Sequence, residues 1–175
     1  MHEFTELVQR STSFTLSVLR KETERLQEAF ETSAATTLVK QAQMIQLQKA
    51  ISAVGIFSIF EAMLQDGLKC TDGFLEAGDI LKAAGHDDLA ERFVDLQKAI
   101  NVLKHGRGRS YDTLVQKAHK LRFRVKLPDE AFFFEGDISE ISTLIEVDDA
   151  FVIYCAEMIW DVSAVIRAQR KDFSF

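Results

Sequence analysis

The sequence is poor in the residues that interrupt or cross-link a chain. It has one proline and eight glycines, and the glycines do not gather into a flexible run, which argues against linkers and disorder. Its two cysteines, Cys70 and Cys155, lie far apart, and no metal-ligand spacing surrounds them. We therefore expect two free thiols in a reducing compartment rather than a disulfide or a metal pair.

Targeting signals and long apolar runs are also missing. The most apolar stretch, residues 50–64, is shorter than the about 20 residues that a membrane span needs, which predicts a buried core helix instead. The first residues lack the basic start and apolar stretch of a signal peptide. The prediction is a cytoplasmic protein without membrane contact.

Several catalytic signatures are absent as well. The glycines at 106 and 108 are not followed by Gly-Lys-Ser/Thr, so they do not form a P-loop. There is no Gly-x-Ser-x-Gly pattern and no cysteine beside a histidine, which removes two common hydrolase nucleophiles. The four histidines do not show metal-ligand spacing. We predict no metal site and no cofactor.

Apolar residues, by contrast, are plentiful and recur at helical spacing. The chain has 175 residues, of which 47% are hydrophobic and fourteen are phenylalanine, enough for one core. We predict one domain, 1–175, with an all-α fold: an up-and-down bundle of four long helices plus one or two short ones. The long helices are expected at 4–32, from after a break at 33–37 to about 66, at 87–105 and at 151–168, and the short ones from about 74 and from 111 to 121.

Helix ends and one extended segment complete the predicted fold. Asp87 and Asp88 are candidate N-caps, with Glu91 as a capping-box partner. Ser110 is expected to cap the short helix after it, and Asp148 the last helix. The residues RFRVKL alternate in polarity, which predicts a short strand or extended segment within 122–135.

Charge is distributed unevenly. Residues 101–126 contain eight basic residues and one acid, whereas the remainder of the chain carries a net charge of −13. Residues 129–149 then contain eight acids and no base. Such blocks indicate a face that binds a polyanion, or two segments that neutralise each other within the fold or across a dimer contact.

The helix predicted at 87–105 carries the candidate site. Its apolar seam ends in Ile100 and Leu103, and Lys98, Asn101 and His105 form a separate stripe. The stripe leads into a basic loop, residues 106–109, so an imidazole lies beside cations that can hold a phosphodiester. The alternative is a histidine that only complements the helix dipole before a glycine stop.

The residues Asn-Val-Leu-Lys-His-Gly, 101–106, at the end of a long helix resemble the motif of the HEPN superfamily of all-α nucleotide- or RNA-binding domains. Asn101 matches the polar position of that motif and His105 its histidine. Ile100 stands where the family places arginine, and the nearest cation on the stripe is Lys98. Because lysine lacks the planar fork of arginine, cleavage is expected to be weak or lost while binding remains.

The resemblance implies a homodimer that binds RNA or a nucleotide, belongs to a toxin–antitoxin or phage-defence system, and has an antitoxin-like partner. If the chain is an endoribonuclease, it is metal-independent and leaves a 2′,3′-cyclic phosphate. His105 is then the general acid or base, and Asn101 holds the phosphate or the imidazole. Lys98, together with Arg107 or Arg109, stabilises the negative charge of the transition state. The implied phosphate- and RNA-binding residues are Lys104, Arg107, Arg109 and Tyr111.

Two further residues and one alternative function stay open at this point. Glu61, inside the most apolar helix, is expected at the helix edge or paired with Lys98, His105 or an arginine. Tyr111 either stacks on a base or packs its helix. The alternative function is a non-catalytic helical protein-interaction module, in which the basic segment pairs with the acidic segment or with a partner.

Overall fold

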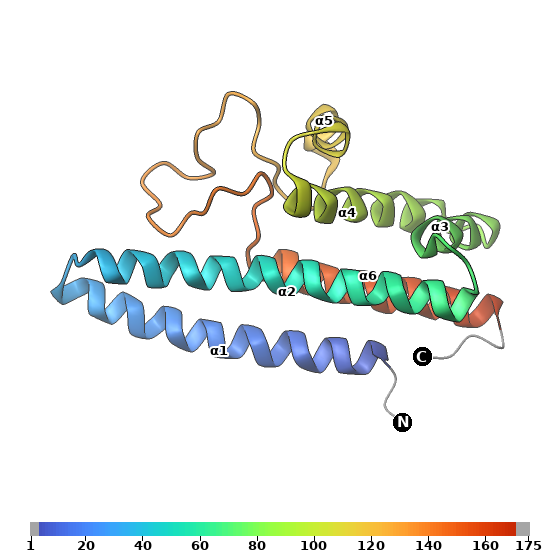
Figure 1. The fold of residues 1–175 in the computed structure, drawn as a ribbon, viewed down its shortest axis with the longest axis horizontal. Coiled ribbons are helices and arrows are strands. Elements are labelled where there is room, and N and C mark those ends of the chain that lie inside the picture. The colour runs from blue at the N-terminus through green and yellow to red at the C-terminus, as the bar shows by residue number, and fades with distance from the viewer. Residues whose placement is uncertain (1–3, 171–175) are drawn as a thin grey trace.

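The computed structural model describes residues 4–170, and this part is all-α and 74% helical, which confirms the predicted fold class. In Figure 1 the four long helices alternate in direction, as expected for an up-and-down bundle. The elements are α1 (Phe4–Thr32), α2 (Thr36–Leu68), α3 (Gly73–Ala83), α4 (Asp87–His105), α5 (Arg109–Gln116), a 3-10 turn (Ala118–Lys120) and α6 (Asp149–Gln169).

The centre of the core is a cluster of four phenylalanines from α2, α3 and α4. Phe57, Phe60, Phe74 and Phe93 have ring centroids 5.4–6.4 Å apart, and Phe57, Phe60 and Phe93 are fully buried. Several of these pairs are edge-on or tilted, the arrangements that aromatic rings favour. The cluster holds the short helix α3 against the long helices.

The last helix, α6, agrees with the sequence in detail. The carboxylate of Asp148 accepts a hydrogen bond from the backbone N–H of Phe151 at 2.7 Å, so the predicted N-cap is confirmed. Its predicted inward residues are all fully buried, as a core helix requires: Val152, Cys155, Ile159, Val162 and Ile166. Both cysteines are free, and burial raises the pKa of the Cys155 thiol.

The turn between α2 and α3 depends on one glycine. A Cβ at Gly73 would lie 2.7 Å from the Leu64 Cβ and 2.9 Å from the Glu61 carbonyl oxygen. Since no side chain tolerates such distances, α3 can start this close to α2 only with glycine at this position.

The position of α2 agrees only in part with the expected core helix. The second half of α2 was expected in the middle of the bundle, and α2 does contact α1, α3, α4 and α6. Its outward side is nevertheless uncovered, since Met44, Leu47, Ile51 and Ile59 of α2 are exposed. Leu7, Phe14 and Val18 of α1 are exposed as well. By length and composition α2 is also apolar enough to cross a membrane, with 28% of its most apolar window buried.

Two predicted helix N-caps are wrong, although α4 spans the residues predicted for it. The N-cap of α4 is His86, without a side-chain cap, while Asp88 binds Arg92 at 2.9 Å instead of forming a capping box with Glu91. The next short helix starts at Arg109, not after Ser110, and follows Gly108. Asp88 and Glu91 bind the side chains of Arg92 and Lys117, so neither carboxylate caps α4 in this structure.

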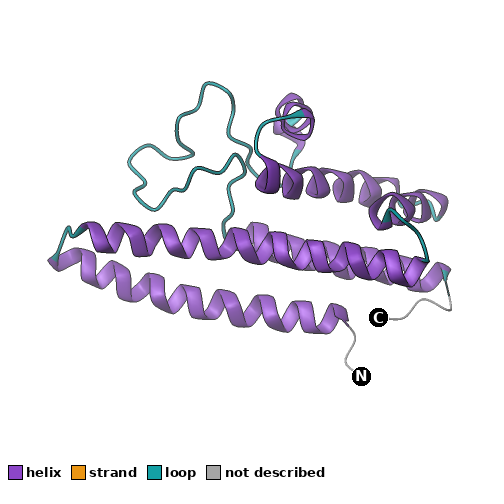
Figure 2. Ribbon diagram, in the orientation of Figure 1, coloured by secondary structure: helices purple, strands orange, loops and turns teal. Residues whose placement is uncertain are grey.

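The segment from 121 to 148 is a long loop between the last turn after α5 and the start of α6 (Figure 2). The strand expected near 122–135 is reduced to an isolated antiparallel bridge between Val125 and Ile145. Phe133 is buried, whereas Phe132 and Phe134 are exposed, so one ring anchors this loop to the bundle.

Candidate nucleic-acid interface

The predicted stripe of α4 is present at the helix surface. Lys98 and Asn101 are half-buried and His105 is exposed, while Ile100 on the seam is only 3% exposed. In the described residues the three polar side chains form neither hydrogen bonds nor ion pairs. The position that the resemblance assigns to arginine is therefore inside the core, and the stripe offers one half-buried lysine in its place.

The helix α4 ends in an exposed cluster of basic side chains. Gly106 has a φ of 73°, a left-handed conformation that favours glycine, and its N–H binds the carbonyl of Val102 at 2.8 Å. This turn separates α4 from α5, and cations lie on both sides of it. We name as the basic corner the exposed residues Lys104, His105, Arg107 and Arg109.

None of the basic-corner side chains forms an ion pair with a carboxylate within residues 4–170. Lys120 and Arg122, the other exposed cations of the basic segment, also lack an ion pair within the described residues, but they line a cavity together with three acids. Those acids are Asp88, Glu91 and Asp95. The basic corner is therefore set apart as an exposed group of basic side chains around one turn, without a carboxylate partner in the described residues.

Of the two roles expected for Tyr111, packing of its helix is the one observed. Its ring is 2% exposed, and its hydroxyl donates a 2.7 Å hydrogen bond to the backbone carbonyl of Lys126. The guanidinium of Arg107 lies over the ring, 5.1 Å from its centroid. A buried ring cannot stack on a base, so Tyr111 is a packing residue that supports Arg107 by a cation–π contact.

Lys117, later in the same basic segment, is neutralised within the fold. Its ammonium group lies 2.5 Å from Asp95 and 3.2 Å from Glu91, which joins the end of α5 to α4. Burial alone would lower the pKa of Lys117, but hydrogen bonds and attraction from the two carboxylates outweigh it and raise that pKa. Lys117 is therefore a structural cation.

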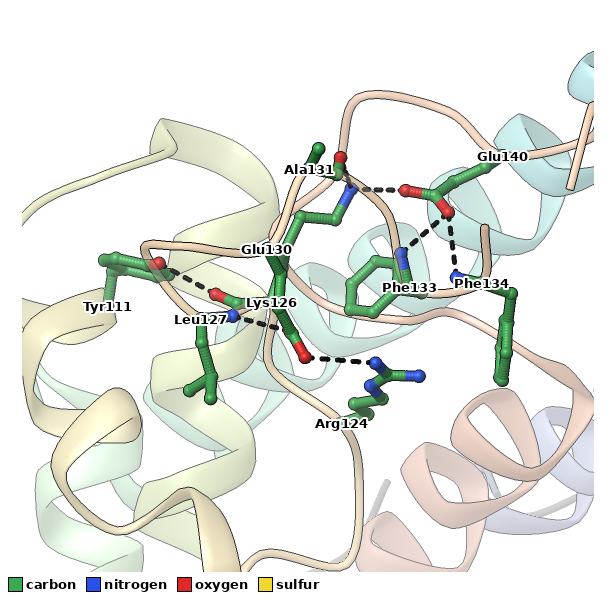
Figure 3. A network of polar contacts seen from close by, with 9 residues as sticks. All are labelled: Tyr111, Arg124, Lys126, Leu127, Glu130, Ala131, Phe133, Phe134 and Glu140. Atoms are coloured by element: carbon green, nitrogen blue, oxygen red, sulfur yellow. Dashed lines mark hydrogen bonds and ion pairs between the residues drawn. The ribbon is translucent and has the colours of Figure 1, made fainter. Parts of the chain in front are cut away.

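Lys126 and Glu140 form a buried ion pair that organises the long loop (Figure 3). Their side chains are 9% and 10% exposed. The Lys126 ammonium also donates to the Ala131 carbonyl at 3.3 Å, and Glu140 accepts from the backbone N–H of Phe133 at 2.8 Å. A charged pair with such further hydrogen bonds fixes the path of the backbone around it.

A second pair flanks the first. Arg124 contacts Glu130 at 3.2 Å, and Glu130 also accepts a hydrogen bond from the backbone N–H of Leu127 at 2.9 Å (Figure 3). The guanidinium of Arg124 lies over the rings of Phe133 and Phe134, 5.5 and 5.0 Å from their centroids. The basic and acidic segments thus neutralise each other here, which was one of the two alternatives for the charge blocks.

Glu61 does not support the candidate site. It is partly exposed near the start of α3, and the described residues do not pair it with Lys98, His105 or an arginine. Of the two expectations, the position at the helix edge is the one observed. Water can solvate the carboxylate there, so its charge does not need a partner.

Sequence reasoning missed the network around Lys126 and the cavity beside it. This cavity of about 400 Å³ lies between α2 and the long loop, and its wall includes Lys126, Phe132 and Glu140 but none of the predicted site residues. The sequence pointed to this network only through the acidic segment, residues 129–149, which directly follows the basic segment. Among the described residues there is no group of three or more metal-ligating side chains.

Comparison with known proteins adds no relative: no family model, curated protein or solved structure matches this chain. The resemblance to the HEPN superfamily therefore depends on the residues at the end of α4 and stays a prediction. Any functional argument has to start from the side chains of the basic corner.

Proposed function

We propose that this chain is a HEPN-like protein that binds RNA or a nucleotide at the basic corner, with ribonuclease activity that is weak or lost. The observation that carries this proposal is the contrast in charge pairing. Lys104, Arg107 and Arg109 are exposed without a carboxylate partner in the described part of the chain, although the chain as a whole is acidic. Phosphate groups are the natural partners of such a cluster.

The geometry of the corner supports phosphate binding in two further ways. Arg107 is held over Tyr111, which limits the freedom of its guanidinium before a ligand arrives. Lys104 and His105 lie on the last turn of α4, and Arg109 starts α5, so the cations surround one short loop. An extended single strand can contact several of them at once.

Weak or lost cleavage follows from the stripe of α4. His105 is exposed and is the candidate general acid or base, with Asn101 one turn before it. The buried Ile100 takes the place of the motif's arginine, and Lys98 is the cation left to stabilise a charged transition state. A toxin–antitoxin or phage-defence setting, with an antitoxin-like partner, remains what the resemblance implies.

The proposal is tested by binding of fluorescently labelled single-stranded RNA, followed by anisotropy. We expect the double variant Arg107→Glu/Arg109→Glu to bind at least about tenfold more weakly, because each reversed charge repels a phosphate that the arginine would hold. The matched control is Lys69→Glu/Lys82→Glu, which makes the same charge change at exposed lysines beside α3. Equal losses in both variants would mean that only overall charge matters, and no loss in either would reject the proposal.

A second candidate, the non-catalytic helical interaction module, is favoured by a different observation. Apolar side chains of α1 and α2 are exposed on the helix surface, where an isolated monomer would leave them in water. The two candidates are compatible, because this surface and the basic corner share no residue.

A further inference from the structure

We propose that a cavity between α4 and α6 binds one base of the RNA strand whose phosphates lie at the basic corner. The cavity lies beside the segment that follows α5 and has a volume of about 180 Å³. We name it the Tyr154 cavity, and four of its lining residues carry the argument: Lys120, Arg122, Phe123 and Tyr154. The inference rests on the proposed function, and it names the ligand as an extended single strand rather than a single nucleotide.

The three acids of the Tyr154 cavity are already paired with cations of the fold. Asp88 contacts Arg92 at 2.9 Å. Glu91 contacts Lys117 at 3.2 Å, and Asp95 contacts the same lysine. These pairs offset the repulsion that the carboxylates would exert on a phosphate. With Lys117 counted, four cations stand against three acids around the cavity.

The two remaining cations of the cavity have no carboxylate of their own. Lys120 and Arg122 are exposed, and within residues 4–170 neither of them forms an ion pair. They lie two residues apart, directly before Phe123 in the wall of the cavity. Unpaired lysine and arginine side chains hold phosphate oxygens well, so they can bind the phosphates that flank a base in the cavity.

The aromatic residues of the cavity give a base rings to stack on. Phe123 and Tyr154 are half-buried, so part of each side chain remains accessible. An edge contact with Phe151, at 5.5 Å between ring centroids, fixes the ring of Phe123. Burial raises the pKa of Tyr154, so its hydroxyl stays protonated and can donate a hydrogen bond. Bases of every kind stack on such rings.

The size of the cavity fits one base and little more. Its volume of about 180 Å³ is below the roughly 300–1,000 Å³ of sites that enclose drug-sized ligands. A flat base can enter, while its sugar and phosphate stay outside beside Lys120 and Arg122. The carboxylate oxygens of the cavity can accept hydrogen bonds from the amino group of a base such as cytosine.

The helix α5 connects the Tyr154 cavity with the basic corner. It begins at Arg109 of the corner, and Lys120 and Arg122 follow its end. Its eight residues span about 12 Å at a rise of about 1.5 Å each. A single nucleotide reaches one of the two sites only. A strand of about four nucleotides or more reaches both, which is the length that single-strand-binding proteins cover.

Binding of labelled single-stranded RNA of about three and about twelve nucleotides, followed by anisotropy, tests the proposal. In Lys120→Gln/Arg122→Gln, affinity for the longer strand should fall about tenfold, because phosphate contacts at the cavity are lost. Affinity for the shorter strand, which the basic corner holds alone, should stay unchanged. The matched control is Lys69→Gln/Lys82→Gln, the same charge change at exposed lysines beside α3, which should bind both strands as wild type does.

A twelve-nucleotide strand of the same charge that lacks its bases tests the stacking. Wild type should bind the complete RNA about tenfold more tightly than this abasic strand, and Tyr154→Leu should remove most of the difference. Circular dichroism checks that each variant has the helix content of wild type.

The outcomes separate this proposal from the proposed function. If Arg107→Glu/Arg109→Glu loses binding but Lys120→Gln/Arg122→Gln binds the longer strand like the control, the cavity proposal is overturned and the basic corner stands. An abasic strand bound as tightly as RNA by wild type also overturns it. If wild type binds neither strand, both proposals fail.

Discussion

Two parts of the basic segment differ in how their cations are paired. Three cations between residues 117 and 126 pair with carboxylates, whereas within the described residues no carboxylate pairs with the cations around the α4–α5 turn. Lys117, Arg124 and Lys126 pair with acids of α4 and the long loop. Three cations of the basic corner, Lys104, Arg107 and Arg109, are exposed and unpaired within residues 4–170. The basic segment thus contains two kinds of cation: those that pair with a carboxylate within the fold and those that do not.

The largest effect should come from the paired region. Lys126→Met leaves Glu140 buried without its cation, which should lower the free energy of unfolding by about 3–5 kcal/mol. Urea unfolding measures this loss. The double variant Lys126→Met/Glu140→Gln removes the stranded charge and should recover part of it. A loss below about 1 kcal/mol in the single variant would mean that the pair does not organise the loop.

Substitutions at His105 and Lys98, which have no ion pair in the described residues, should change RNA cleavage and leave the stability of the fold unchanged. Labelled RNA incubated with the protein in EDTA should be cleaved slowly or not at all, because losing one charge-stabilising group costs on the order of a hundredfold or more in rate. Any residual cleavage should disappear in His105→Ala and fall in Lys98→Ala. Robust cleavage that survives His105→Ala would remove the α4 stripe from consideration.

The smallest expected effect is the pH dependence of the free energy of unfolding, which distinguishes Lys117 from the cations of the basic corner. Its pKa is raised in the folded chain, so it stabilises the fold below the usual value of 10.5, and this contribution is lost as pH rises through the folded pKa. Between neutral pH and about pH 11, wild type should lose more stability than Lys117→Met. Urea midpoints at both pH values test this, and equal losses would show that Asp95 and Glu91 do not stabilise the charged form.

The fold was predictable from the sequence because helical periodicity is a local signal. The seam of α4 and the inward face of α6 repeat every three or four residues, and Asp148 caps its own helix three residues later. The predictions that failed concern contacts between residues far apart in the sequence. Phe14 has the spacing of a core residue but points away from the bundle, since spacing does not say which apolar side of a helix finds a partner.

The sequence predicted where the candidate site residues lie along the helices, but it did not predict all of their contacts. His105 and the loop after it lie at a helix end, as their sequence indicates. Tyr111 is buried because its hydroxyl meets a backbone carbonyl fifteen residues later, and Arg124 is neutralised by a loop carboxylate. These partners depend on the path of the long loop, which carries no periodic signal.

The salt dependence of RNA binding tests the central contrast most directly. The proteins to compare are wild type, Arg107→Glu/Arg109→Glu and Lys126→Met, each under conditions where circular dichroism shows it folded. The logarithm of the wild-type binding constant should fall linearly with the logarithm of salt concentration. The slope should shrink by about 0.7 for each phosphate that the corner variant no longer binds, and it should stay unchanged in Lys126→Met. An unchanged slope in the corner variant, or the same reduction in Lys126→Met, would contradict the separation of binding cations from structural ones.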